Sequence, residues 1–209
     1  METRTVAPRV SQGIGADLRL RPGILFCMQS EAACALALLR RPGCVGGILA
    51  LTLTSSIIAL LRFGWTPRLW CLVPLLIALA AVVVLDLRTK FIPDVITIPG
   101  LAYALVVATF MESPSLGGAV LGAVTGGGIV LLVAVVSRGA VGGGDIKLMG
   151  MLGAALGWKG ALAVLAFSQV AAALVALTLL IAQRAKRGDL LPVGAIISLL
   201  GMVMLLGGP

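Results

Sequence analysis

The stretch VGGGDIK at residues 141–147 separates two long apolar runs of this chain. Its three glycines allow the backbone to turn sharply and to approach other groups closely. They place one carboxylate, Asp145, and one ammonium group, Lys147, at the start of the second run. A charged side chain within a bilayer costs about 2.5–3.5 kcal/mol on insertion scales, which makes Asp145 a candidate functional residue. The alternative is a Gly-rich loop in which a solvated Asp caps the following helix.

Two further carboxylates lie in comparable positions and favour the functional interpretation. Asp86 ends another apolar run, and Asp94 follows it directly after Pro93. The remaining acidic residues lie in the N-terminal region, in a turn or in a basic loop. The chain has no His, so paired carboxylates are the groups available to it for acid–base catalysis.

The composition is that of a polytopic membrane protein. Of the 209 residues, 60% are hydrophobic and only 11% are charged, whereas soluble domains average about 25% charged residues. The formal net charge is +8, but the basic residues lie in loops between apolar runs and form no stripe. That distribution is typical of membrane orientation, and we expect no nucleic-acid partner.

The four cysteines give no sign of a metal site. Cys27, Cys34, Cys44 and Cys71 form no C-x-x-C pair, and without His they lack the partners that complete a zinc site. We interpret them as small apolar residues in or near helices. The sequence therefore predicts no metal and no cofactor.

The first 42 residues differ from the rest of the chain. Residues 1–42 contain six arginines and an apolar stretch at 24–39 that polar residues interrupt. We expect a basic N-terminal segment with an interfacial helix. A signal peptide is the alternative, although its polar leader would be long and its apolar core broken. Residues 43–209 are predicted to form the transmembrane domain.

That domain is predicted to be an all-α bundle of six or seven transmembrane helices. Pro93 separates the second span from the third, because proline lacks the N–H that a continuing helix needs. Gly118, Gly122 and Gly126 lie four residues apart in the fourth span, and we expect them to form a close helix contact. The predicted spans are residues 43–61, 70–86, 95–111, 116–137, 145–158, 159–183 and 191–206.

The basic residues also predict the orientation of these spans. With the N-terminus in the cytoplasm, only Arg62, Arg68 and Lys159 of the 16 basic residues fall on the other side. Cytoplasmic loops carry an excess of Lys and Arg, so this orientation is favoured. It places the three carboxylates at the cytoplasmic surface of the membrane.

Two neighbouring carboxylates suit hydrolysis of a peptide bond. They do not both ionise easily, so the pair tends to share one proton. The ionised group activates a water, while the protonated group polarises the carbonyl and then protonates the leaving amine. The alternative is a proton-coupled transporter, because carboxylate pairs also serve as proton relays in membranes.

Two motifs resemble the signatures of one family, the type IV prepilin peptidases. DLRTKFIPD at residues 86–94, followed by VITIP, resembles the first signature. GGGDIKLMG at 142–150, followed by LGAALGW at 152–158, resembles the second. The second is the G-x-G-D motif that presenilin-type intramembrane proteases also show. The resemblance covers roughly residues 69–192.

The resemblance implies an activity and a set of site residues. The two catalytic aspartates of the family map onto Asp86 and Asp145. Supporting positions map onto four residues, which are Lys147, Asp94, Gly142 and Gly144. Family members remove the basic leader from prepilin or pseudopilin substrates, just before the hydrophobic segment. The resemblance thus implies a multi-pass protein of the inner membrane, in contact with the lipid bilayer, whose active site faces the cytoplasm.

The chain departs from the larger bacterial members in one respect. Those members carry an N-terminal insertion with paired C-x-x-C motifs and also N-methylate the new terminus, whereas this sequence has no such pairs. The resemblance therefore does not extend to N-methyltransferase activity, and a short, peptidase-only member is the better fit.

Overall fold

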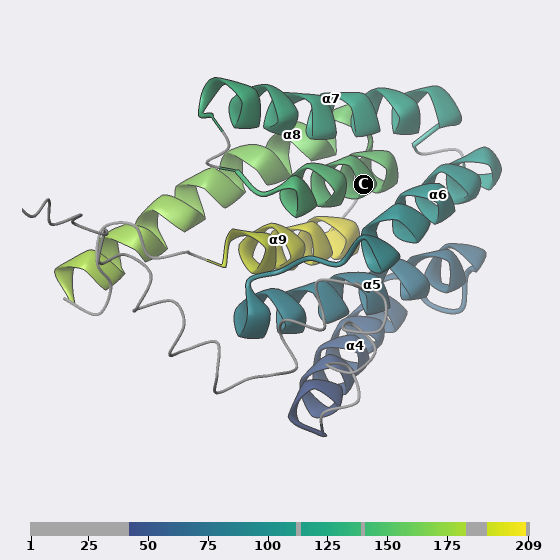
Figure 1. Cartoon of the computed structure of the whole chain (residues 1–209). Coiled ribbons are helices and arrows are strands. Elements are labelled where there is room, and N and C mark those ends of the chain that lie inside the picture. The colour runs from purple at the N-terminus through teal and green to yellow at the C-terminus, as the bar shows by residue number, and fades with distance from the viewer. Residues whose placement is uncertain (1–41, 112–113, 139–140, 183–191, 208–209) are drawn as a thin grey trace, which may run out of the picture.

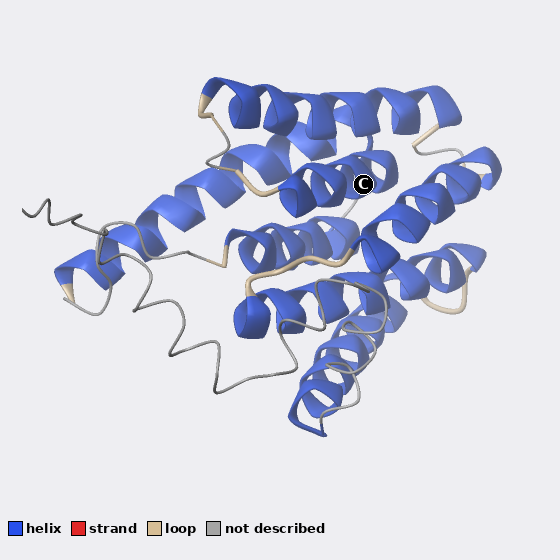
Figure 2. Cartoon of the chain, in the orientation of Figure 1, coloured by secondary structure: helices blue, strands red, loops and turns tan. Residues whose placement is uncertain are grey.

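The computed structural model describes residues 42–111, 114–138, 141–182 and 192–207. Within these ranges the chain consists of α-helices joined by short loops and contains no strand (Figure 2). The predicted all-α bundle is thereby confirmed. The N-terminal segment, with its predicted interfacial helix, lies outside the described residues apart from Pro42.

Six helices make up the described part of the chain (Figure 1). Their order in space is α7, α8, α9, α5 and α4, with α6 packed against α5, α7 and α8. The helices are α4 (Pro42–Phe63), α5 (Pro67–Thr89), α6 (Asp94–Phe110), α7 (Leu116–Val136), α8 (Gly143–Ile181) and α9 (Val193–Gly207).

Prolines and small polar residues set the helix boundaries. Pro67 opens α5, where the missing N–H of proline costs nothing. Pro93 lies between α5 and α6, as the sequence predicts. The side chain of Ser115 accepts a hydrogen bond from the N–H of Gly118 (3.3 Å) and so caps α7.

A single glycine folds α8 back on itself. Gly157 has φ 74° and ψ 175°, a backbone region that is essentially restricted to glycine. Gly126 of α7 approaches both Met149 and Ala161, one residue from each half of α8. The two halves are therefore antiparallel neighbours on α7. They correspond to the predicted fifth and sixth spans, which the structure joins at Gly157 without a loop.

The glycines of α7 make the contact with α8. A Cβ on Gly122 would lie 2.0 Å from the carbonyl oxygen of Gly153, and a Cβ on Gly126 would lie 2.6 Å from that of Met149. The predicted close contact is confirmed for these two positions. Gly118 lies beyond it, because a Cβ there would meet only its own cap residues, Ser115 and Pro114.

The helices are apolar enough for a multi-pass membrane protein. Four of them, α4, α5, α7 and α8, have the length and hydropathy to cross a bilayer, while α6 and α9 are shorter apolar helices. The C-terminal half of α5 is buried from Leu75 to Asp86, apart from two positions. The candidate site lies at the end of this central helix.

Candidate active site

Asp86 lies in the last turn of α5 and is held by another helix. Its side chain is 5% exposed, and Oδ2 accepts a hydrogen bond from the N–H of Ala195 (2.7 Å). Ala195 belongs to the first turn of α9. The helix ends just beyond, because Lys90 adopts the left-handed conformation and its N–H donates to the carbonyl oxygen of Asp86.

Asp145 lies in the first turn of α8. Gly142 precedes that turn as the N-cap residue, and its carbonyl oxygen accepts the N–H of Asp145 (3.1 Å). The Asp145 side chain is partly exposed. It borders a cavity of about 140 Å³ whose other lining residues, all apolar except Gln169, are Val130, Val133, Val141, Leu165, Gln169, Val193 and Ile197.

The carboxyl groups of Asp86 and Asp145 both lie next to the same glycine, Gly194. A Cβ on Gly194 would lie 3.2 Å from Oδ1 of Asp145 and 3.2 Å from Cγ of Asp86. Gly194 itself is buried in the first turn of α9. The two aspartates are also close enough for their charges to interact. The structure thus brings together the two residues that the motifs single out, from α5 and α8.

The loop between α5 and α6 closes over this pair. Ile92 is 7% exposed, and its Cδ1 would lie 2.5 Å from a Cβ on Gly194. A Cβ on Gly144 would lie 2.8 Å from the Cβ of Ile92. Gly144 therefore occupies a position where a side chain would displace the loop. Gly142 does not, because a Cβ there would make only an ordinary contact, 3.6 Å from Oδ2 of Asp145.

The other two predicted supporting residues bind each other. Lys147 Nζ and Asp94 Oδ2 form an ion pair. The side chains are 43% and 34% exposed, so the pair lies at the surface. It links the first residue of α6 to the start of α8.

Sequence reasoning missed three contributors to the site, which are Ile92, Gly194 and the backbone N–H of Ala195. A weak signal for Gly194 exists, because it lies two residues after Pro192, near the start of the last apolar run. Glycine allows the backbone to approach another group closely. Nothing in the sequence indicates that the neighbour would be Asp86.

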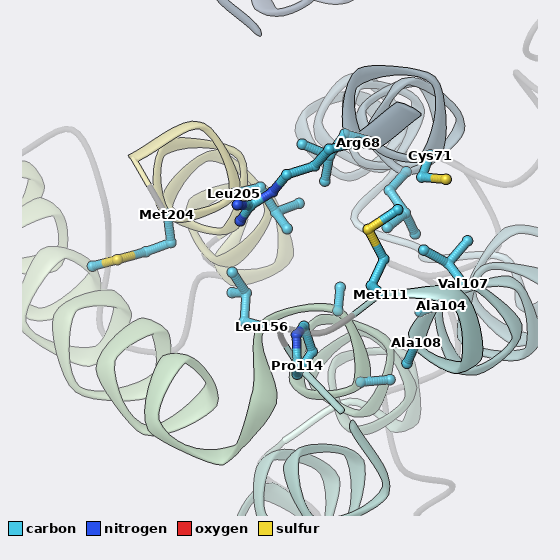
Figure 3. A pocket seen from close by; sticks show the side chains of 14 residues that line it. Arg68, Cys71, Ala104, Val107, Ala108, Met111, Pro114, Leu156, Met204 and Leu205 are labelled. Carbon is cyan, nitrogen blue, oxygen red and sulfur yellow. The ribbon is translucent and has the colours of Figure 1, made fainter. Parts of the chain in front are cut away.

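A second cavity lies at the opposite end of the bundle and carries no catalytic groups. It has a volume of about 90 Å³ and lies between α5, α6, α8 and α9. Figure 3 shows Arg68 reaching across it toward Leu205. The guanidinium carbon of Arg68 also lies 4.9 Å from the centre of the Phe63 ring. In the described residues, no three His, Cys, Asp or Glu side chains are grouped to hold a metal ion.

Comparisons with known proteins identify the family. The model of the type IV leader peptidase family matches residues 73–177, a range that includes both aspartates. A protein from Pseudomonas putida named "Prepilin leader peptidase/N-methyltransferase" is 32% identical over 158 residues, which are 73% of this chain and 55% of that protein.

Two further proteins of the same name give a similar result. The one from Burkholderia pseudomallei (strain K96243) is 34% identical over 155 residues, 72% of this chain and 50% of that protein. The one from Pseudomonas aeruginosa is 30% identical over 165 residues, which are 77% of this chain and 57% of that protein. The chain spans about half the length of these curated relatives. No solved structure matches it significantly. On the family match, this chain belongs to the type IV leader peptidase family.

Proposed function

We propose that this protein is a membrane-embedded aspartic endopeptidase. It removes the basic leader peptide from prepilin or pseudopilin substrates at the cytoplasmic face of the inner membrane. The observation that carries the proposal is the meeting of Asp86 and Asp145 over Gly194. Membership of the leader peptidase family favours this function over a proton-coupled transporter. The proposal covers the peptidase reaction alone.

The chemistry needs only the two carboxyl groups and a water molecule. With one proton shared between them, the ionised group takes a proton from the attacking water. The protonated group donates to the scissile carbonyl oxygen. Partial burial at the end of α5 strengthens the electrostatic coupling between the two groups, so they act as one unit.

The surroundings of Asp145 suit a substrate that is half polar and half apolar. The cavity beside Asp145 is lined mainly by apolar side chains of α7, α8 and α9, and we propose that it receives the first hydrophobic residues after the cut. The basic leader then lies toward the cytoplasm. That orientation is supported by the basic residues Arg88, Lys90 and Lys147 at this end of the bundle.

The test is co-expression with candidate prepilins, in which mass spectrometry reads removal of the leader. The wild-type protein is expected to cleave, and Asp86→Asn and Asp145→Asn are each expected to abolish cleavage at matched membrane levels. Asn keeps the size of the side chain but neither shares a proton nor activates water. If either variant cleaved as efficiently as the wild-type protein, the paired-carboxylate mechanism would be excluded.

Filling the cavity provides a separate test of where the substrate lies. Leu165 lines the cavity and is partly buried, so Leu165→Trp should raise KM and leave kcat nearly unchanged. Leu162→Trp is the matched control, because Leu162 is an exposed residue of α8 that does not line the cavity. An equal rise in KM for both variants would contradict the proposed position.

A further inference from the structure

We infer that the first turn of α9 gives the two aspartates unlike roles. The N–H of Ala195 holds the negative charge on Asp86, which acts as the base, while Asp145 carries the shared proton and acts as the acid. Gly194 is the positioning residue that allows α9 to come this close. The inference rests on the proposed peptidase function and adds an assignment to it.

The N–H of Ala195 donates to Asp86 and not to Asp145, and this hydrogen bond favours the charged form of Asp86. Ala195 donates to Oδ2 at 2.7 Å, and Asp86 is 5% exposed. The N–H groups of a first helical turn have no acceptor within their own helix, so the N–H of Ala195 is available to Asp86. A donor directed at a carboxylate stabilises its ionised form.

Asp145 lacks such a donor. Within the described ranges, no group donates a hydrogen bond to its side chain. Asp145 also lies in a first turn, that of α8, but its carboxyl group accepts none of the N–H groups there. With one proton for two carboxyl groups, the group without the donor retains it. Asp145 also borders the cavity, which places the acid on the side of the proposed substrate.

The proton balance of the reaction closes with these roles. As the water oxygen bonds to the scissile carbonyl carbon, one water proton moves to Asp86 and the Asp145 proton moves to the carbonyl oxygen. The C–N bond then breaks while the proton on Asp86 passes to the leaving nitrogen. Asp145 regains a proton from one hydroxyl of the tetrahedral intermediate. The products are a carboxylic acid and an amine, and both aspartates return to their starting states.

Gly194 is where this arrangement is most sensitive to a side chain. A Cβ there would lie 2.5 Å from Cδ1 of Ile92 and 3.2 Å from both Cγ of Asp86 and Oδ1 of Asp145. Ile92 can rotate away, but the carboxyl groups then have to separate from α9 by a few tenths of an ångström or more. Small displacements of catalytic groups have large kinetic effects, about 10²-fold for 1 Å.

Two variants test the assignment in the full chain with a prepilin substrate. Ala195→Pro removes the N–H at a first-turn position, where proline is compatible with a helix. Gly194→Ala displaces the first turn of α9 but keeps the N–H of Ala195. We expect kcat to fall about tenfold or more in both, with KM within about twofold. In Ala195→Pro the acidic limb of the kcat–pH profile should move to higher pH, because the ionised base has lost its donor.

Gly201→Ala is the matched control. It lies on α9, and its added Cβ would meet Leu152 Cδ2, also at 2.5 Å, away from the carboxyl groups. Its kcat and pH profile should equal those of the wild type. Gly194→Ala also serves as the decisive variant if Ala195→Pro does not fold.

Three results would overturn the inference. The first is an unchanged kcat and pH profile in folded Gly194→Ala, and the second is a rise in KM alone. The third is an equal loss of kcat in Gly201→Ala, which would show that any added side chain packed against α9 slows the reaction. In all three cases inactive Asp86→Asn and Asp145→Asn would leave the proposed function standing. Active Asn variants would instead remove the function itself.

Discussion

Glycine brings the backbone close to a neighbour in two regions of this molecule, and the neighbours differ. On α7, a Cβ on Gly122 would lie 2.0 Å from a backbone oxygen of α8. On α9, the three atoms nearest to a Cβ on Gly194 would all belong to side chains. A helical carbonyl cannot move without separating the helices, whereas side chains can rotate. The α7 contact should therefore control assembly, and the α9 contact should control the geometry of the aspartates.

The largest expected effect is loss of activity without loss of structure. Asp86→Asn and Asp145→Asn should each reduce leader cleavage by at least about 10³-fold, and the double variant should be no worse, because groups that act as one unit fail together. The measurement is prepilin processing in membranes at matched expression. A double variant that is much slower than both single variants would show that the two aspartates act independently.

The α7 contact should show the opposite behaviour. Gly122→Leu inserts a side chain against the backbone of α8, and overpacking of this kind typically costs about 1–3 kcal/mol or more. We expect a lower melting temperature and less folded protein in the membrane. Gly128→Leu is the control, since no atom lies within 4 Å of a Cβ at that position of α7. Equal stability of the two variants would show that α7 and α8 do not touch here.

The surface ion pair should have a smaller effect on the site. Lys147→Ala and Asp94→Asn remove the link between α6 and α8, and exposed pairs contribute about 0.2–1 kcal/mol. Cleavage should therefore fall only a few-fold in either variant. The charge-swapped double variant, Lys147→Asp with Asp94→Lys, should recover part of the loss. No recovery would assign Lys147 a role that does not depend on Asp94.

Gly118→Ala should have the smallest effect. A Cβ there would lie 3.5 Å from Ser115 Oγ, which is an ordinary contact, so stability should stay within about 0.5 kcal/mol of the wild type. Thermal unfolding in detergent measures this directly. A loss as large as that of Gly126→Ala would extend the α7 contact to the start of the helix.

The sequence predicts the helices and the two aspartates better than it predicts their neighbours. Local signals are sufficient for a span boundary such as Pro93 and for the turn at Gly157, which lies one residue from the predicted boundary. The hydrogen bond from Ala195 to Asp86 joins residues that are 109 positions apart. Hydropathy and spacing carry no information on which helix ends meet, so that contact and Ile92 could not be predicted.

Two of the helices around the aspartates are short for a bilayer. α6 has 17 residues and α9 has 15, which correspond to lengths of about 25 Å and 22 Å at 1.5 Å per residue. A hydrocarbon core is about 30 Å thick, so these helices are mismatched while the outer helices α4 and α7, with 22 and 21 residues, are not. Lipids thin locally to cover a short hydrophobic stretch. We expect the membrane to be thinnest beside the aspartates, where the aqueous phase is then closest to the bond to be cut.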